Sequence, residues 1–342
     1  MAFREIMIKN DVVMDGITDK KPTVINPQYE AQAGSLLDRL HNYGKDIQEK
    51  AFGDISSFNF SKDVFWGGHW NEMTTKARGL FLNNRTGKVV ARGFEKFFAY
   101  KERGYNTDEW LKDNLKFPVD CYVKYNGFLG ILGFDDNGLL FCTKSNIGGD
   151  FAQWFERIFR KDDHHEKELL DYMRTCNVGF VFEVIDPVND PHIVEYAHEE
   201  LILLDCVKLG EEFRDVGYDG LVALAEQFNF TVKNKVLTFD DWDTLHDFLV
   251  NQEGNMTDRK EGYVLVDASN YHFKLKCGWY KFWKWMRTMK DKVGKKGYQV
   301  NVSGINNVEA LNFIGWMRNT HDAEYLQSHN IIELRNEYES RK

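Results

Sequence analysis

Residues 119–127 read V-D-C-Y-V-K-Y-N-G, a run of alternating side chains that ends in a lysine and a turn. Because successive side chains of a β-strand point to opposite faces, the alternation places Val119 and Cys121 on one face and Tyr122 with Lys124 on the other. Lys124 therefore lies at the end of a predicted strand. The K-x-x-G tetrapeptide that it opens fits two interpretations, a solvated lysine ahead of a β-turn or a lysine that carries chemistry, and the tetrapeptide alone does not decide between them.

The sequence on both sides of this strand shows further β-type patterns. Between residue 76 and about residue 206, short apolar runs are separated by turn signals such as Asp136-Asn137-Gly138. The runs are GLFLN, KVVARG, CYVKY, FLGILGF, LLFCTK, GFVFEVI and ELILLDCV, followed later by GYVLVD and HFKLK. Helices are predicted around residues 151–159, 167–174, 221–228 and 239–249, the last capped by Asp240 or Thr238. These patterns predict an α+β fold that is rich in antiparallel sheet.

The C-terminal part of the chain changes to helical periodicity. From about Trp279 the pattern is helical, and Val308, Leu311, Ile314 and Met317 recur at helical spacing. We place a boundary near residue 285, which gives a main domain of residues 1–285 and a small helical C-terminal domain of residues 286–342. A helical piece of this size is too small to be secure alone, so we expect it to pack on the main domain.

The composition limits the classes of protein that fit. A net charge of -9 argues against a protein that coats nucleic acid without discrimination, but it leaves room for a local basic groove. Five widely spaced cysteines and ten histidines without metal-site spacing predict neither a disulfide framework nor a zinc site. Aromatic residues make up 15% of the chain, which provides core volume and surfaces on which bases stack. We find no signal peptide or membrane span and expect a soluble cytoplasmic protein.

A second pair of cations lies in the stretch H-F-K-L-K at residues 272–276. Period-two alternation sends Lys274 and Lys276 to one face and Phe273 with Leu275 to the core. Exposed lysines on an edge strand commonly discourage aggregation, and the alternative is a paired positive site for a phosphate.

Two lone carboxylates lie within otherwise apolar β-type stretches, Glu183 in GFVFEVI and Glu261 in KEGYVLVD. Carboxylates in such surroundings need partners. Glu261 fits a turn residue before Gly262 and Glu183 fits a structural ion pair, whereas the functional alternatives are a divalent metal ion or a ribose hydroxyl.

The order of these motifs resembles that of the covalent nucleotidyltransferases, the superfamily of ligases and capping enzymes. In that superfamily a K-x-x-G lysine is followed by a strand carboxylate, an E-G dipeptide and a K-x-K strand, and here the series is Lys124, Glu183, Glu261-Gly262 and Lys274-x-Lys276. The chain is most similar to the phage-type RNA ligase 1 family, because A-R-G-L-F, F-E-K-F-F, E-G-Y-V and H-F-K-L-K followed by W-Y all look like that family. The resemblance covers roughly residues 75–285.

The resemblance implies an adenylyltransferase domain and an ATP-dependent RNA ligase that joins 5′-phosphate and 3′-hydroxyl ends. It implies that Lys124 carries AMP, that Arg78 and Lys96 hold the ATP phosphates or ribose, and that Glu183 binds the ribose hydroxyls. It also implies that Lys274 and Lys276 bind ATP, that Lys144 is a further ATP-binding lysine, and that Glu261 supports a metal ion, Mg²⁺ or Mn²⁺, or the lysine network.

The chemistry requires a neutral Lys124 amine, although a free lysine has a pKa near ~10.4. We expect Lys274 and Lys276, together with a divalent cation, to lower the pKa of Lys124.

Three points remain open in the sequence. Residues 281–296 hold seven basic residues against one acidic and are either an RNA-contacting surface or an ordinary solvated helix. A capping guanylyltransferase or a DNA ligase would place a β-barrel after the last lysine motif, which 66 mostly helical residues disfavour. A non-catalytic RNA-end-binding module is disfavoured by the intact motif set. The resemblance suggests broken tRNA as a substrate and RNA repair, in the cytoplasm or a phage-infected host, as its setting.

Overall fold

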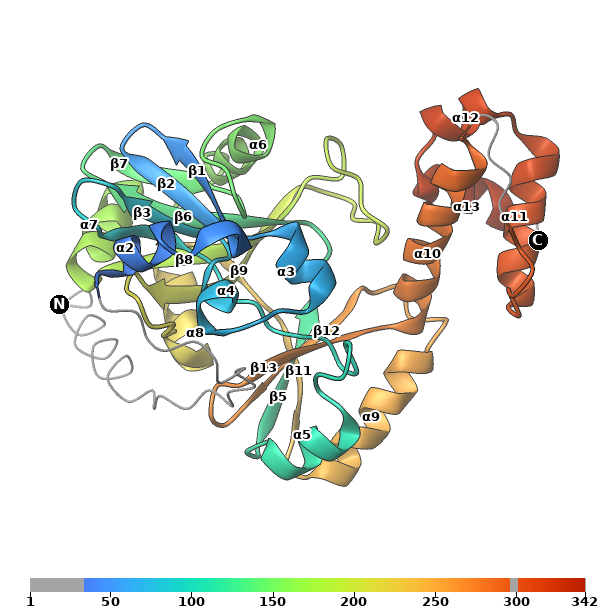
Figure 1. The fold of residues 1–342 in the computed structure, drawn as a ribbon, viewed down its shortest axis with the longest axis horizontal. Coiled ribbons are helices and arrows are strands. Elements are labelled where there is room, and N and C mark those ends of the chain that lie inside the picture. The colour runs from blue at the N-terminus through green and yellow to red at the C-terminus, as the bar shows by residue number, and fades with distance from the viewer. Residues whose placement is uncertain (1–33, 296–300, 342) are drawn as a thin grey trace.

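The computed structural model describes residues 34–295 and 301–341, and it consists of three sheets with helices around them (Figure 1). The first sheet is antiparallel, in the order β1 (Ile47–Phe52), β2 (Ile55–Phe60), β3 (Leu80–Asn83) and β4 (Val89–Arg92). Short helices α2 (Leu36–His41), α3 (Lys62–Gly67) and α4 (Glu72–Lys76) accompany it. Residues 1–33 of the predicted main domain lie outside the described residues.

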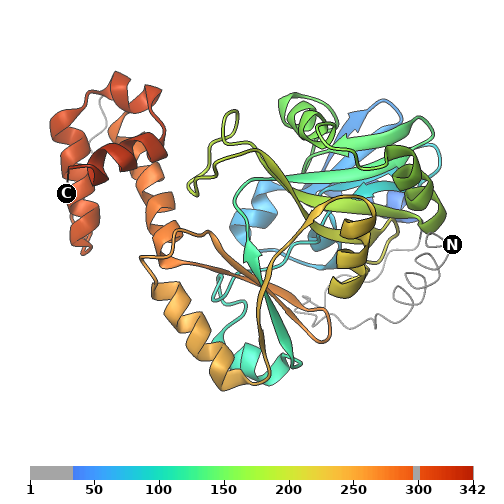
Figure 2. The same ribbon diagram turned by 180° about the vertical axis from the view of Figure 1, so that it is seen from behind.

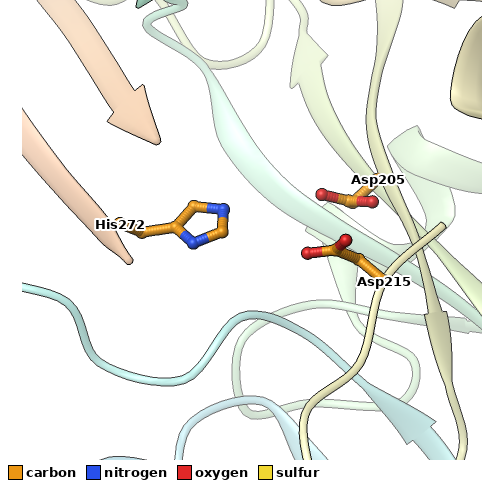
Figure 3. Close-up of side chains that lie close together, drawn as sticks. All are labelled: Asp205, Asp215 and His272. Atoms are coloured by element: carbon orange, nitrogen blue, oxygen red, sulfur yellow. The ribbon is translucent and has the colours of Figure 1, made fainter. Parts of the chain in front are cut away.

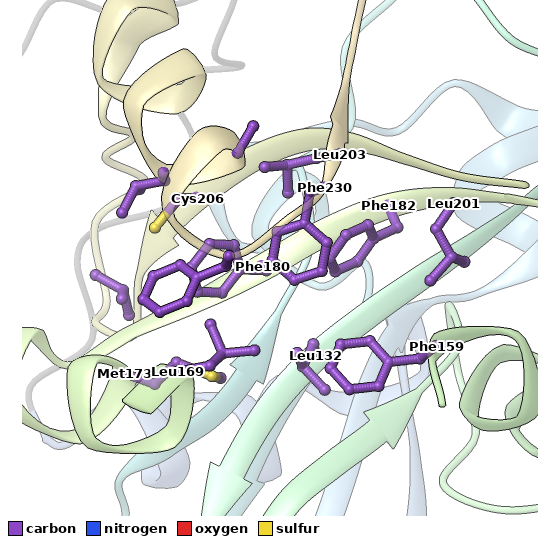
Figure 4. Close-up of a cluster of buried hydrophobic side chains, with 14 of the residues drawn as sticks. Leu132, Phe159, Leu169, Met173, Phe180, Phe182, Leu201, Leu203, Cys206 and Phe230 are labelled. Atoms are coloured by element: carbon purple, nitrogen blue, oxygen red, sulfur yellow. The ribbon is translucent and has the colours of Figure 1, made fainter. Parts of the chain in front are cut away.

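The second sheet has five strands, in the order β10 (Thr231–Val232), β9 (Glu200–Lys208), β8 (Val178–Ile185), β6 (Phe128–Asp135) and β7 (Gly138–Cys142). Only the β9–β10 pair is parallel. Helices α6 (Asp150–Phe159), α7 (Glu166–Cys176) and α8 (Gly217–Gln227) pack on it, and their apolar faces enclose a large aromatic core with Phe180, Phe182 and Phe230 (Figure 4). Burial of these side chains is the main force that holds the layers together.

The third sheet carries the predicted lysine strands. Its order is β11 (Lys235–Phe239), β5 (Val119–Lys124), β12 (Gly262–Asp267) and β13 (His272–Lys276), all antiparallel. Helices α5 (Asp108–Asn114) and α9 (Trp242–Gly254) belong to its core, which includes Val119 and Cys121 as the alternation predicted. The cap of α9 is Asp241, whose side chain accepts from the Thr244 amide, and not Asp240 or Thr238.

After β13 every described element is a helix: α10 (Gly278–Val293), α11 (Val308–Thr320), α12 (Ala323–Ser328) and α13 (Ile331–Glu339). Their apolar faces form a separate core with Trp279 and Trp283 of α10, and the group projects from one side of the sheets (Figure 1, Figure 2). The α+β prediction with a helical C-terminal region is confirmed. The boundary at residue 285 stays a prediction, and α10 runs across it without a break. Among the described residues, no helix combines the length and apolarity that crossing a bilayer requires.

Candidate active site

The register of the third sheet brings the two predicted lysine motifs together. Gly262 at the start of β12 lies opposite Lys124 of β5 on one side and opposite Lys276 of β13 on the other. Gly262 has φ of +152°, and a Cβ there would lie 1.9 Å from the Leu275 carbonyl oxygen. Only glycine tolerates this approach, so the E-G dipeptide is what allows the two lysine strands to flank the same point.

The side chain of Glu261 links the two lysines. Lys124 Nζ lies 2.9 Å from Glu261 Oε2, and Lys276 Nζ lies 3.3 Å from Oε1. The Asn126 side-chain amide donates to Oε2 at 3.0 Å. Glu261 is only 4% exposed, and this burial raises the pKa of its carboxyl, but the charges of Lys124 and Lys276 outweigh burial and the net shift is downward. Glu261 is therefore ionised and held from three directions.

The expected effect of the cations on Lys124 is wrong for the ligand-free protein. Burial lowers the pKa of Lys124, but the carboxylates of Glu261 and Glu183 raise it, and the net shift is upward. Among the neighbouring charges, the Glu261 carboxylate, 2.9 Å from the Lys124 amine, has the largest effect. Lys124 is thus a cation before a nucleotide binds.

Glu183 approaches the same point from the second sheet. The backbone amide of Gly127 donates to Glu183 Oε1 at 2.8 Å. A Cβ on Gly127 would lie 2.1 Å from the Val184 carbonyl oxygen, so the glycine of K-x-x-G allows the loop to reach β8. Burial raises the pKa of Glu183, Lys124 lowers it, and Glu261 raises it further, with a net upward shift.

Lys274 and Lys96 lie together because residues 94–100 run alongside β13. The Lys274 amide donates to the Phe98 carbonyl at 3.2 Å, and the Tyr100 amide donates to the Lys274 carbonyl at 2.8 Å. Burial lowers the pKa of Lys274, and the nearby charges of Lys96, Arg78 and Lys124 lower it further. This end of the site concentrates positive charge without enough carboxylates to balance it.

Arg78 and Lys144 complete this group of cations. The Arg78 guanidinium donates to the Phe94 carbonyl at 2.9 Å, and Lys96 pairs with Glu102 at 3.0 Å. Desolvation, together with the charges of Arg78 and Lys96, lowers the pKa of Lys144 to about 8. The sequence-predicted residues therefore fall into two adjoining groups, one around Glu261 and one with Arg78, Lys96, Lys144 and Lys274.

Comparison with known proteins shows the family of the chain. The model of the phage-type RNA ligase 1 family, described as RNA ligase, matches residues 76–280, more than half of the chain. The chain belongs to this RNA ligase family. The matched region begins just before Arg78 and ends at Tyr280, so it contains every residue of the two groups.

Two curated relatives and two solved structures extend the comparison. The chain is 24% identical over 268 residues to a tRNA ligase of Candida albicans, a match that covers 66% of this chain and 31% of the relative. It is 24% identical over 360 residues to tRNA ligase 1 of Schizosaccharomyces pombe, a match that covers 94% of this chain and 44% of that relative. The chain thus spans less than half the length of these relatives.

The solved structures agree on the fold. An archaeal ATP-dependent RNA ligase superposes with a TM-score of 0.53 at 12% identity, covering 85% of this chain and 72% of that one. A putative ATP-dependent DNA ligase of Aquifex aeolicus superposes with a TM-score of 0.51 at 14% identity, and the match covers 83% of this chain and 72% of that one.

Sequence reasoning did not identify the contribution of α10 to the site. The Lys276 ammonium lies 5.1 Å from the centre of the Tyr280 ring, and Tyr280 is buried. Desolvation and the charge of Lys276 lower the pKa of Lys284 to about 8. Of the two tryptophans in the basic segment, Trp283 is buried and Trp285 is 37% exposed, while Lys296 lies outside the described residues. The W-Y that follows H-F-K-L-K was the available signal for Tyr280.

Histidine spacing also failed to reveal a cluster between the second and third sheets. Asp205, Asp215 and His272 each place one potential ligand atom within 4.8 Å of the other two (Figure 3). Their polar atoms have protein partners: Lys233 lies 3.4 Å from Asp205, and Asn270 donates to Asp215 at 2.8 Å. Burial raises the pKa of Asp205, the charge of Lys233 lowers it and that of Asp215 raises it. The net result is a pKa of about 7. The cluster joins β9 to β13 across the two sheets.

Proposed function

We propose that this chain is an ATP-dependent RNA ligase that forms a covalent AMP adduct on Lys124. The observation that supports this most strongly is the pairing of the Lys124 and Lys276 amines on one buried carboxylate, Glu261. This pair adjoins the second group, whose four cations outnumber its carboxylate, Glu102. A half-buried amine beside a concentration of positive charge is what attack on a nucleoside triphosphate requires.

The two groups of residues take different parts of ATP. Five cations hold the phosphates: Lys276 together with Arg78, Lys96, Lys144 and Lys274. The pKa values of the last four are lowered in the free protein, so these groups gain most from an anionic ligand. Glu183, whose carboxylate already accepts from the Gly127 amide beside Lys124, binds the ribose hydroxyls. The adenosine therefore lies toward the second sheet and the phosphates toward residues 94–98.

The proton on Lys124 must leave before the amine attacks. The carboxylates of the buried Glu261 and the half-buried Glu183 are oxygen donors of the kind that hold Mg²⁺ or Mn²⁺. Such a cation would supply positive charge that disfavours the ammonium form of Lys124 and neutralises charge on the phosphates.

The reaction then proceeds by three displacements at phosphorus. The Lys124 nitrogen bonds to the α-phosphorus, loses its proton, and pyrophosphate leaves. An oxygen of an RNA 5′-phosphate bonds to the same phosphorus, the P–N bond breaks, and the amine regains a proton. A 3′-hydroxyl finally attacks the RNA phosphorus, loses its proton, and AMP leaves.

The test is adduct formation with labelled nucleotides and magnesium. We expect wild type to retain label from α-labelled ATP in an acid-labile bond and not from GTP, and Lys124→Ala and Lys124→Arg to retain none. Lys112→Ala, which removes an exposed lysine of α5, is the matched control and should label normally. Labelling by GTP would indicate a capping enzyme, and no labelling of wild type would indicate a non-catalytic RNA-end-binding module.

The substrate that we propose is RNA with 5′-phosphate and 3′-hydroxyl ends, and specifically broken tRNA. The two curated relatives are named tRNA ligases, which supports this choice. Ligation of tRNA broken in the anticodon loop should exceed ligation of unstructured RNA with the same ends. Equal joining of nicked DNA would contradict an RNA substrate.

A further inference from the structure

Two aromatic side chains of α3 are exposed next to the cationic end of the site. Trp66 is 69% exposed and Phe65 is 37% exposed, although aromatic residues of this size are usually buried for most of their area. Arg103 fixes the pair, since its guanidinium donates to the carbonyl oxygens of Phe65 and Trp66 at 2.6 and 3.1 Å. The same guanidinium lies 5.5 and 5.6 Å from the centres of the two rings. Solvent therefore meets a rigid aromatic surface with a cation at its edge.

A row of ring contacts connects this surface to the cations of the site. Phe65 stacks on Phe60 with centroids 6.3 Å apart, Phe60 meets Trp70 edge-on at 4.8 Å, and Trp70 meets Phe98 at 5.6 Å. We call these residues, with Trp66 and Arg103, the aromatic track. The Lys96 ammonium lies 4.1 Å from the centre of the Phe98 ring, and the Lys144 ammonium lies 4.5 Å from that of Phe60. The track thus begins at two proposed phosphate-binding lysines and ends at Trp66.

The charge along the track is positive in a protein whose net charge is -9. Lys96, Lys144 and Arg103 contact its rings directly. The carboxylate of Glu102 lies 3.0 Å from Lys96, so three cations of the track face this one carboxylate. Bases stack on exposed aromatic rings while neighbouring cations hold their phosphates, so the track fits a single-stranded nucleic acid.

The geometry of phosphoryl transfer decides which RNA strand lies there. Entering and leaving atoms lie on opposite sides of phosphorus in an in-line displacement. Pyrophosphate leaves from the side opposite Lys124 when AMP is attached, and the RNA 5′-phosphate must enter opposite Lys124 when AMP is removed. The two groups therefore occupy the same cationic position in turn.

We propose that the aromatic track binds the 5′-phosphorylated strand, an inference that rests on the proposed function. The phosphate of this strand lies at Lys96 and Lys144, and its first bases stack on Phe65 and Trp66. The nucleotides enter the track only after pyrophosphate has left. The track then selects RNA over free phosphate, since a lone phosphate has no base to stack.

The experiment separates the steps of the reaction in Trp66→Ala and Trp66→Tyr. Removal of the exposed Trp66 ring should leave lysine adenylylation by ATP within two-fold of wild type. The KM for AMP transfer to a 5′-phosphorylated oligonucleotide should rise on the order of ten-fold or more in Trp66→Ala, in line with the loss of one base stack. Trp66→Tyr keeps a ring and should recover most of the loss. Leu237→Ala, which truncates an exposed apolar side chain on β11, should change neither step.

The 3′-hydroxyl strand provides the second arm. With pre-adenylylated RNA as donor, the KM for the 3′-hydroxyl strand should be the same in wild type and Trp66→Ala. The proposal is overturned if Trp66→Ala transfers AMP to RNA with an unchanged KM, if it slows adenylylation by ATP to the same extent, or if the change falls on the 3′-hydroxyl strand. Wild type that forms no AMP adduct would instead overturn the proposed function.

Discussion

At the scale of single residues, the site depends on how one carboxylate is shared. Glu261 accepts from Lys124, Lys276 and Asn126, and the low exposure of the carboxylate makes each of these contacts strong. The result is a lysine whose charged form is favoured in the ligand-free protein, and in the proposed reaction it stays charged until phosphates arrive. The amine is thus positioned in advance, and its activation depends on the substrate.

Asn126 is expected to act as a positioning residue. Its amide donates to Glu261 while its carbonyl oxygen accepts from the Val194 amide at 3.2 Å. Asn126→Ala should slow formation of the AMP adduct roughly ten-fold, since loss of a hydrogen bond to a charged group costs about 1.5–3 kcal/mol. Single-turnover labelling measures this, with exposed Asn137→Ala as the control. An unchanged rate together with an unchanged pH profile would show that Asn126 is only structural.

Lys144 should make ATP affinity depend on pH. Its pKa of about 8 in the free protein rises when an anion binds, so ATP binding takes up a proton above pH 8. The affinity for ATP is then full below this pKa and falls as the pH rises through it. Titrations between pH 7 and 9.5 should show a smaller loss of affinity for Lys144→Arg, which stays charged, than for wild type. Parallel curves for the two proteins would contradict this role.

At the scale of elements, the strand register is what brings the motifs together. Gly262 is the position where the register is most sensitive, because any side chain there meets the backbone of β13. Gly127 has the corresponding function between the two sheets.

Gly262→Ala is therefore expected to separate β12 from β13. The new Cβ would lie 1.9 Å from a backbone oxygen, so the strands must shift. The free energy of unfolding should therefore fall by about 3 kcal/mol or more. Thermal unfolding and AMP labelling should both decline. Gly254→Ala is a suitable control, because that glycine of α9 has open space around it and alanine favours helix. Equal melting temperatures for Gly262→Ala and wild type would contradict the register argument.

The strands and helices that touch the site were largely predictable. Every apolar run quoted between residues 76 and 276 forms a strand, since alternation and turn signals are local properties. β1, β10 and β11 were not predicted, because exposed positions hide the alternation of β1 and β11 and because β10 has only two residues. The pairing of β5 with β12, and hence the sharing of Glu261, depends on contacts 135 or more residues apart that no local pattern contains.

The error about the pKa of Lys124 has the same origin. The sequence shows that cations and carboxylates occur in the motifs, but the sign of the shift depends on which group stands nearest. Glu261 stands nearest, so the pKa of Lys124 rises where we expected it to fall.

At the scale of the whole molecule, the candidate site lies where the second and third sheets meet, and buried charges hold this junction. Asp205 of β9 and His272 of β13 face one another there (Figure 3). The helical region joins the junction from the other side through α10, whose Tyr280 and Lys284 lie beside Lys276. The stability of the junction should therefore respond to pH.

Asp205 supplies that pH dependence. Its folded-state pKa of about 7 exceeds the usual value of a carboxyl, so its contribution to stability is full below about pH 4 and is lost as the pH rises through 7. Asp205→Asn removes this pH-dependent contribution to stability. The difference between the melting temperatures of the variant and of wild type should shift in favour of the variant by several degrees between pH 5 and pH 8. A constant difference across that range would contradict the assignment.

The most direct test of the central claim is to map the nucleotide on the protein itself. The chain is incubated with ATP and magnesium without RNA, digested, and sequenced by mass spectrometry. We expect one AMP on the peptide that contains Lys124, and its loss when 5′-phosphorylated RNA is added. AMP on Lys274, Lys276 or another residue, or an adduct that RNA does not remove, would contradict the account.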